Sequence, residues 1–432
     1  MTIASPSINT PNDNRYRWLI QEFLSVLLVV VLVIAAVTAV TLHAVLTHID
    51  QVLHLSFAVE MFNEGNLTTP HFLHQALLIM VYILTGQTSW GFSTLLANLL
   101  PQLFLGTLLY AMLRTSVHQA VWAQRHLWGA RFLSIGLAVS LVIMTPATVL
   151  FGIVSPFLQD ANEFNSMLLG FVTPTTFHNP TMTILRPFTL ILFLLITKFV
   201  LQPGLRDASR GRVLLVITLT ALATILCGLA KPNYLLAVLP AVVLWLAWSW
   251  FRKLFGGWTN AIFGVLVPGG LFLVWQFLFT YVASTAVLGS SSIAFAPFEV
   301  IFGLVGGSTG LVIARLIASV SLPVLIYALY WRRARQDHAL NFAWLTFVIG
   351  MSYMLLLAET GGRKFHGNFF WSGYITFFIV NVVSVRFALV QWLGDVAVNK
   401  RALTGRTILI LSLFLLILVN SIIYMVQFYQ WG

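Results

Sequence analysis

Apolar stretches of about 20 residues recur along the whole chain, and each is long enough to cross the hydrocarbon core of a bilayer. The first, Trp18 to Leu42, is too long for the apolar region of a signal peptide, so we expect an uncleaved first span. The pattern predicts an all-α, polytopic transmembrane helical bundle of about 11 spans, a single domain over residues 1–432. The further spans are expected at 90–113, 132–154, 183–202, 212–230, 233–251, 261–288, 310–331, 340–358, 369–393 and 406–428.

The segment between residues 43 and 113 allows two interpretations. It contains two apolar stretches, 72–86 and 90–113, and two crossings here would make 12 spans. The first stretch is short for a span and begins Pro70-His71-Phe72-Leu73-His74. We therefore expect interfacial or re-entrant helices in a first outer loop at 43–89, and the 12-span alternative stays open.

Composition and charge support a membrane protein. Of the 432 residues, 59% are hydrophobic and 8% are charged, whereas a soluble domain carries roughly 25% charged residues. The net charge of +11 is spread over short alternate loops, which disfavours nucleic-acid binding and indicates anionic lipids as partners. The basic loops contain Arg114, Arg125 and Arg131; Arg206, Arg210 and Arg212; Arg252 and Lys253; Arg332, Arg333 and Arg335; and Lys400, Arg401 and Arg406.

The positive-inside rule places these basic loops, and a tail at residues 1–17, in the cytoplasm. The expected location is the inner (plasma) membrane, with a multi-pass chain and a cytoplasmic N-terminus. The polar residues that remain gather in the loops on the opposite, extracytoplasmic side. We therefore expect an active site on that face.

The first outer loop offers acids and imidazoles. Asp50 and His54 are four residues apart, which puts both on one face of a helix that Gly65 would end. A carboxylate flanked by imidazole at a membrane surface can act as a general base, and Glu60 lies farther along the same segment. The alternative is a solvated loop in which Asp50 only caps a helix.

Histidines are concentrated in the same region, at positions 43, 48, 54, 71 and 74. Such a cluster could bind a divalent metal, but the spacing matches no specific site. The single cysteine, Cys227, excludes a cysteine-based metal site and an internal disulfide. We therefore assign no metal ligands.

Cationic and polar residues return in later outer segments. Arg186 follows the stretch Phe177-His178-Asn179-Pro180-Thr181, and an intramembrane cation near the outer surface is a functional candidate or a snorkelling arginine. Lys231 lies in a tight turn between two spans, which places it at the outer interface. We expect His178, Asn179, Arg186 and Lys231 to contact a substrate or a lipid phosphate.

The last outer segment reads Glu359-Thr-Gly-Gly-Arg363-Lys364-Phe-His366-Gly-Asn-Phe-Phe-Trp371. Arg363 could form a fork onto a phosphate, or it could pair locally with Glu359. Trp371 could stack on a sugar or belong to the aromatic belt. Arg363, Lys364, His366 and Trp371 complete the expected binding residues.

This combination of features resembles the C-type superfamily of membrane glycosyltransferases (GT-C), in a poorly characterised bacterial branch. The resemblance rests on the acid in the first outer loop and on the stretches Phe-His178-Asn-Pro-Thr, Ala-Lys231-Pro-Asn and His366-Gly-Asn-Phe-Phe-Trp371. Asp50 takes the position of the family's first-loop acid, although many members have paired acids and here Gln51 follows. Glu60 or Glu64 would be the substitutes.

The resemblance implies transfer of a sugar from a polyprenyl-phosphate-linked donor to a glycan, lipid or protein acceptor. A carboxylate would deprotonate the acceptor, and the cations Arg186, Lys231, Arg363 and Lys364, with His366, would stabilise the departing phosphate. Two other classes stay open: a transporter or flippase, and a protein of the O-antigen polymerase or ligase type. A purely structural membrane subunit is a further alternative.

Overall fold

The fold is described from a computed structural model of the chain. It describes residues 11–118, 126–145, 171–202, 209–253, 257–283, 292–305, 309–399 and 403–430. The expected cations Arg125, Arg206, Lys400 and Arg401 lie outside these residues. The same is true of residues 146–154, the last nine residues of the span predicted at 132–154.

Helices account for nearly all of the described chain. Their bounds are α1 Pro11–Thr47, α2 Ile49–Glu64, α3 Leu73–Leu84, α4 Trp90–His118, α6 Leu127–Ile143, α9 Pro180–Phe199, α10 Arg210–Ala230, α11 Asn233–Phe251, α12 Trp258–Asn260, η2 Ala261–Leu266, α13 Val267–Phe277, η3 Leu278–Ala283, α15 Glu299–Val305, α16 Thr309–Leu329, α17 Trp331–Ala334, α18 His338–Leu356, η4 Gly361–His366, α19 Phe370–Asn399 and α20 Gly405–Gln430. The described strands, β1 Ile293–Phe295 and β2 Leu357–Glu359, pair antiparallel.

The predicted all-α polytopic bundle is confirmed. Within the described residues, ten helices are long and apolar enough to cross a membrane. Helix α6, of 17 residues, packs against α1 and α4 and occupies the place of the eleventh expected span. The sequence missed the strand pair, which forms where the polypeptide leaves α18 and meets the segment before α15.

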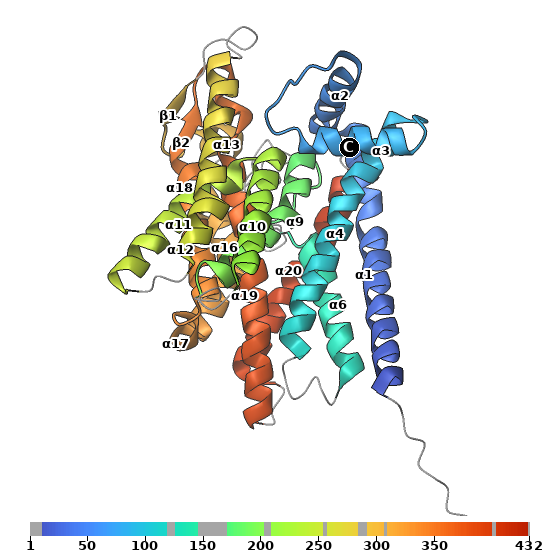
Figure 1. Cartoon of the computed structure of the whole chain (residues 1–432), viewed down its shortest axis with the longest axis vertical. Helices are drawn as coiled ribbons and strands as arrows, with labels where there is room; N and C mark the ends of the chain where they lie inside the picture. The colour runs from blue at the N-terminus through green and yellow to red at the C-terminus, as the bar shows by residue number, and fades with distance from the viewer. Residues whose placement is uncertain are drawn as a thin grey trace, which may run out of the picture.

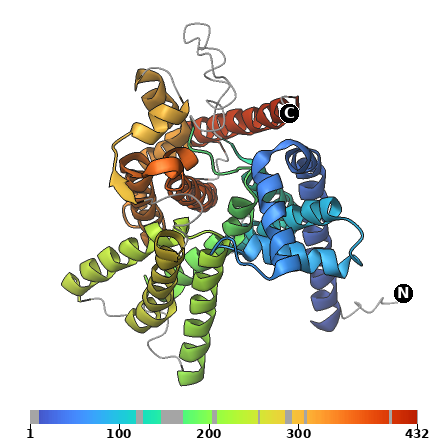
Figure 2. The same ribbon diagram turned by 90° about the horizontal axis from the view of Figure 1, so that it is seen from above.

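Helices α2 and α3 lie at one end of the bundle, above the ends of α1 and α4 (Figure 1). Seen from above, both cover the group of helices built from the N-terminal part of the chain (Figure 2). Helix α3 has only 12 residues, too few to cross a bilayer, so the expected non-crossing helix is found at 73–84. Helix α20 ends at this same end of the bundle, where Phe428 stacks near His48 with ring centroids 6.3 Å apart.

Several boundaries differ from those expected. Helix α1 continues to Thr47, five residues beyond Leu42, so His43 belongs to the helix and not to the first outer loop. The helix already begins at Pro11, so part of the predicted tail at 1–17 is helical. In the second outer loop, residues 171–179 are buried inside the bundle rather than exposed on its surface.

An ion cluster ties three helices together at the other end of the bundle. The carboxylate of Glu22 on α1 accepts hydrogen bonds from Arg114 on α4 and Arg131 on α6, each with its shortest N–O distance at 3.1 Å. Tyr110 donates to the second oxygen of Glu22 at 2.7 Å. The start of α1, the end of α4 and the start of α6 therefore share one side, which requires α4 to cross and α3 not to cross.

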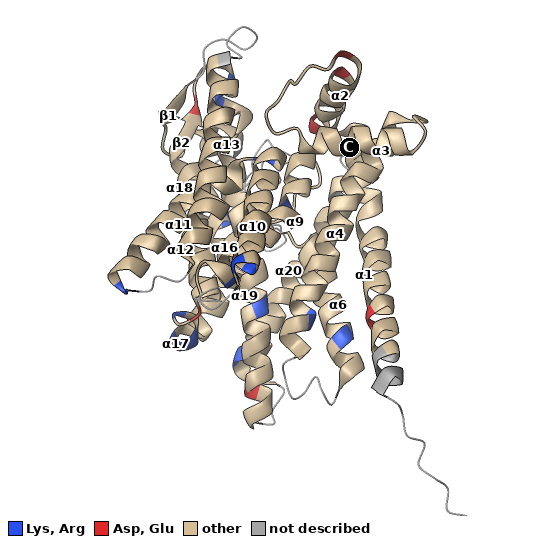
Figure 3. Cartoon of the chain, in the orientation of Figure 1, with Lys and Arg blue, Asp and Glu red and all other residues tan. Residues whose placement is uncertain are grey.

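Basic residues gather at this end (Figure 3), and we call it the basic end; the opposite end, which carries α2, is called the α2 end. The distribution is the one that the positive-inside rule predicts for alternating loops. The orientation of the bundle in a particular membrane stays a prediction.

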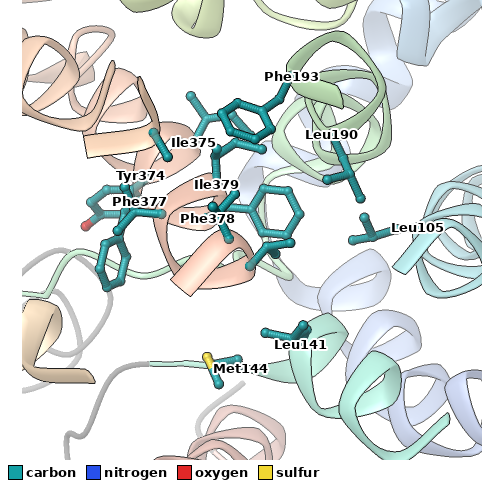
Figure 4. Close-up of a cluster of buried hydrophobic side chains, with 14 of the residues drawn as sticks. Leu105, Leu141, Met144, Leu190, Phe193, Tyr374, Ile375, Phe377, Phe378 and Ile379 are labelled. Atoms are coloured by element: carbon teal, nitrogen blue, oxygen red, sulfur yellow. The ribbon is translucent and has the colours of Figure 1, made fainter. Parts of the chain in front are cut away.

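Helix α19 forms the centre of the bundle. Its side chains Tyr374, Phe377 and Phe378 are almost completely buried. Phe378 points towards residues of α4, α6 and α9 (Figure 4), whereas the ring of Phe377 lies 5.6 Å from that of Phe347 on α18. Close packing against α18 depends on Gly350, where an added Cβ would lie 2.5 Å from the carbonyl oxygen of Ser372. Small residues at such crossings let membrane helices approach each other closely. This core fixes the α2-end termini of α9, α11 and α19 relative to each other.

Candidate functional site

Four chain segments that are far apart in the sequence meet at the α2 end. They are the first turn of α2, the start of α9, the short turn between α10 and α11, and the start of α19. Their polar residues are within hydrogen-bond or ring contact of one another, and we call them the outer cluster: His48, Asp50, His178, Asn179, Thr181, Lys231 and Trp371.

Asn179 joins α2 to α9. It is the N-cap of α9, and its Oδ1 accepts hydrogen bonds from the Met182 amide at 3.0 Å and the Thr181 hydroxyl at 2.7 Å. Pro180 at the first helical position completes a favourable helix start. The Asn179 amide Nδ2 donates to Asp50 Oδ2 at 3.2 Å. The N-cap therefore also orients the carboxylate.

Asp50 is half-buried in the first turn of α2. It does not cap the helix, because the N-cap position belongs to His48. Gly65 ends the helix in a left-handed conformation with φ 72°, as expected from the sequence. Asp50 thus presents its carboxylate to the outer cluster from a rigid helical position.

Lys231 is the cation of the outer cluster. Its side chain is only 6% exposed, so the tight turn buries it inside the protein rather than at the lipid interface. Nζ donates to Thr181 Oγ1 at 3.1 Å and lies 4.7 Å from the ring centroid of Trp371. Burial lowers the pKa of Lys231 to about 8, although the nearby negative charge of Asp50 acts in the opposite direction.

Lys231 and Asp50 are close enough to influence each other, but no ion pair joins them in the described part of the chain. Thr181 uses one of the three ammonium protons. Lys231 therefore retains donors for an anion beside the carboxylate.

Two imidazoles and an indole line the same place. The rings of His48 and His178 are 4.8 Å apart, and Trp371 lies 5.9 Å from His178. Burial lowers the pKa of His178 to about 3 and also lowers that of His48, so both rings are neutral at physiological pH. Nδ1 of each ring is buried without a hydrogen-bond partner. Neutral imidazoles with unused nitrogen atoms can bind hydroxyl groups.

His54 lies one turn after Asp50 but faces α3. Its Nδ1 is 2.8 Å from Gln75 Nε2, and its ring lies 6.0 Å from that of His74. Burial lowers the pKa of His54 well below its usual value, and the charge of Lys231 adds to this shift. His54 therefore fixes α2 against α3 and is neutral beside the outer cluster.

Arg363 extends the positive charge of this end. Desolvation lowers the pKa of His71 to about 3, and the charges of both Lys231 and Arg363 contribute to this lowering. The local ion pair with Glu359 does not form, since Glu359 instead accepts from Tyr281 at 2.6 Å. Nε of Arg363 is buried without a hydrogen-bond partner. Arg363 is thus a second cation at the α2 end with unused donor capacity.

Two other expected contacts lie apart from this arrangement. Lys364 forms an ion pair with Glu299, and both side chains are substantially exposed. His366 is exposed at the end of η4. Neither residue is brought into contact with the outer cluster.

Arg186 occupies a different place from the one expected. Its side chain is 2% exposed, and its guanidinium donates to the carbonyl oxygens of Leu141 at 3.3 Å and Val142 at 2.9 Å. It also lies over the ring of Phe378 at 4.9 Å. A cation at the end of a helix satisfies its last carbonyl groups and its dipole. Arg186 therefore caps α6 within the bundle and does not face lipid.

The other acids of α2 are less favourably placed than Asp50. Glu60 is ten residues farther along the helix, which corresponds to about 15 Å. Glu64 is exposed and accepts from Asn66 at 2.9 Å. In the described residues no group of three or more His, Cys, Asp or Glu side chains could hold a metal ion.

Sequence reasoning did not assign roles to Thr181, His48 or Gln51. Gln51 is buried, and its side chain reaches Asn98 on α4 and the carbonyl oxygens of Phe177 and His178. The Asn179-Pro180 pair is a helix-start signal that could have placed Thr181 near the site. No such local signal marks Gln51 and His48, which only the tertiary structure brings to the outer cluster.

No protein-family model, no curated protein and no solved structure matches this chain. The chemistry of the outer cluster and its position at the end of a membrane-spanning helical bundle are therefore the features that indicate a function.

Proposed function

We propose that this protein is a membrane glycosyltransferase that uses a polyprenyl-phosphate-linked sugar as donor at the α2 end of the bundle. The observation that carries the proposal is the placement of one half-buried carboxylate, Asp50, beside one buried ammonium group, Lys231, without an ion pair between them. Sugar transfer from a phosphate leaving group needs a base that deprotonates the acceptor and a cation that binds the departing phosphate. The two groups must not neutralise each other in an ion pair.

In the proposed reaction Asp50 removes the proton of an acceptor hydroxyl. The acceptor oxygen forms a bond to the anomeric carbon of the donor sugar, while the bond from that carbon to the phosphate oxygen breaks. Polyprenyl phosphate leaves with the electron pair of that bond, and Lys231 stabilises its negative charge. His178 and Trp371 contact the sugar by hydrogen bonding and stacking.

The pattern of charges favours a lipid-linked donor. Lys231 and Arg363 lie at an end of the bundle where cations are otherwise few (Figure 3). The positive end of the α9 dipole points into the same cluster and favours a phosphate there. A donor phosphate at this depth leaves its polyprenyl chain among the apolar surfaces of the surrounding helices.

The deciding experiment compares Asp50→Asn with wild type in reconstituted vesicles. The substrates are a panel of tritiated hexoses linked to undecaprenyl phosphate, and the readout is release of undecaprenyl phosphate together with transfer of label. Asn keeps an oxygen for the Asn179 contact, so folding should be preserved, while loss of the base should slow turnover by about 10²- to 10⁴-fold.

Glu60→Gln is the matched control, because it neutralises another carboxylate of α2 outside the outer cluster. It should retain wild-type turnover. Full activity of Asp50→Asn, or loss of activity in both variants, would contradict the role given to Asp50.

A transporter or flippase for lipid-linked sugars is the second candidate, and the geometry of α6 favours it. This helix is shorter than a full span, and its last carbonyl groups are capped by Arg186 about two turns inward from the start of α9. Helices that end within the bundle are typical of transporters. If the labelled lipid-linked sugar moved across the vesicle membrane without release of undecaprenyl phosphate, the protein would be a transporter or flippase and not a glycosyltransferase.

A further inference from the structure

An apolar cavity of about 230 Å³ lies between α6, α16, α19 and α20, in the half of the bundle nearest the basic end. Its lining includes Leu133 of α6, Ile326 of α16, Ala388 and Trp392 of α19, and Thr407 of α20. It lies far from the outer cluster, which is at the opposite end of the bundle. The proposed glycosyltransferase reaction does not involve it.

The cavity opens sideways towards the surface of the bundle. Leu322 and Ile326 on its inner wall are buried, whereas Leu403 and Leu411 on the α20 side are exposed. These exposed leucines belong to, or immediately precede, a helix that is long and apolar enough to span a membrane. Material entering from this side would therefore come from the hydrocarbon region.

A cation lies at the mouth of the cavity. The guanidinium of Arg406 is positioned 5.9 Å from the ring centroid of Tyr330, which lines the cavity. Arg406 is exposed and has no acidic partner among the described residues. The neighbouring Arg333 is already bound to Asp395 at 2.9 Å. Among the described residues, Arg406 is thus a cation available to an anion at the cavity mouth.

We propose that this cavity binds one acyl chain of an anionic phospholipid whose headgroup phosphate contacts Arg406. The wall selects hydrocarbon because, among the described residues that line it, hydroxyl groups belong to Tyr330 and Thr407 alone, close to the basic end. The cation selects a lipid with net negative charge over a zwitterionic one. Such a lipid would fill the space between α6, α16 and α20 and hold these helices against α19.

The experiment measures binding of a phosphatidylglycerol with brominated acyl chains to the full-length protein in phosphatidylcholine micelles, by quenching of tryptophan fluorescence. Trp392 lines the cavity, so Trp392→Phe should remove the saturable part of the quenching. Ala388→Phe fills the cavity and should weaken this binding at least tenfold. Thr407→Phe fills the cavity from α20 and should also weaken this binding at least tenfold. It provides a second test in case Ala388→Phe folds poorly.

Val390→Phe is the matched control, since Val390 is on the same helix but exposed and outside the cavity lining. It should bind as wild type does. Arg406→Gln should retain acyl-chain binding but lose the preference for phosphatidylglycerol over brominated phosphatidylcholine by about the same factor of ten.

Two results would overturn the proposal. Unchanged quenching in well-folded Ala388→Phe and Thr407→Phe would show that lipid does not enter the cavity. Equal binding of the two brominated lipids by wild type would remove the headgroup contact with Arg406. The transfer reaction at the α2 end is measured separately, so either result leaves the proposed function unaffected.

Discussion

Replacing Lys231 with Met tests the cation of the outer cluster most directly. Met has a similar length and keeps apolar contact with Trp371, but it removes the ammonium group and its hydrogen bond to Thr181. If Lys231 binds the donor phosphate, affinity must fall. If it only holds the turn between α10 and α11, the change must instead lower stability.

The expected loss of affinity follows from the kind of contact. Hydrogen bonds to a charged group contribute about 1.5–3 kcal/mol, and about 1.4 kcal/mol corresponds to tenfold in affinity. Lys231→Met should therefore bind a polyprenyl phosphate about 10- to 150-fold more weakly than wild type.

Stability should not fall in parallel. Burial lowers the pKa of Lys231 from 10.5 to about 8, which means that at neutral pH the folded protein holds a charge at a cost on the order of 3 kcal/mol. Met carries no such cost, and the hydrogen bond from the charged ammonium group that it loses contributes about 1.5–3 kcal/mol, which at most offsets the gain. Lys231→Met should thus melt at the same temperature as wild type or higher.

The assay is titration of a fluorescent polyprenyl phosphate into purified protein in detergent, followed by anisotropy, with thermal unfolding measured on the same samples. Lys364→Met is the control, because it removes an exposed cation already paired with Glu299. It should change affinity less than twofold. Wild-type affinity in Lys231→Met, or a lower melting temperature with unchanged affinity, would refute the phosphate-binding role.

Four further predictions concern other parts of the molecule. Lys231 is mainly protonated below its pKa of about 8, so the affinity of the wild type for polyprenyl phosphate should decrease above that pH. The variant Lys231→Arg should show no such decrease up to at least about pH 10, because a guanidinium stays charged. Arg363→Ala should weaken the same binding, whereas Arg363→Lys should recover only part of it, since an ammonium lacks the planar fork; equal binding by all three proteins would exclude a contact. Arg186→Leu should lower the melting temperature with little change in affinity, because it leaves two carbonyl groups of α6 without a donor. Single cysteines at Asn66 and Arg335 should react from opposite sides of the membrane in right-side-out vesicles, with the buried Cys227 silent; labelling from the same side would contradict the span assignment.

Part of the outer cluster could be anticipated from individual residues. Asp50, His178, Asn179, Lys231 and Trp371 are polar or amphipathic groups placed at the ends of apolar stretches, where a membrane chain otherwise has few such groups. Their proximity could not be anticipated, because up to 321 residues, from 50 to 371, separate them in the sequence. Nothing local specifies which helix ends become neighbours.

Arg186 shows the limit of local reasoning most clearly. Its sequence position, near the start of the apolar stretch 183–202, is compatible with a lipid-phosphate contact, with snorkelling and with a structural cap. Only packing decided among these, because α6 ends beside α9 and offers its last carbonyl groups to the guanidinium. The same holds for Glu359: the sequence left a local ion pair with Arg363 as one alternative, and in the structure Glu359 instead accepts from Tyr281 of a distant helix.

The sequence by itself determined the class of the fold, the approximate position of most spans, and the separation of basic and polar ends. Hydrocarbon thickness sets the length of a crossing helix, and charge sets its sidedness, so both properties are readable one segment at a time. The tertiary structure alone decided which helices are neighbours, which cations are buried, and that Asp50 and Lys231 come close enough to influence each other without forming an ion pair. Those properties depend on side-chain packing between distant helices, for which an apolar sequence offers many nearly equivalent surfaces and therefore no local signal.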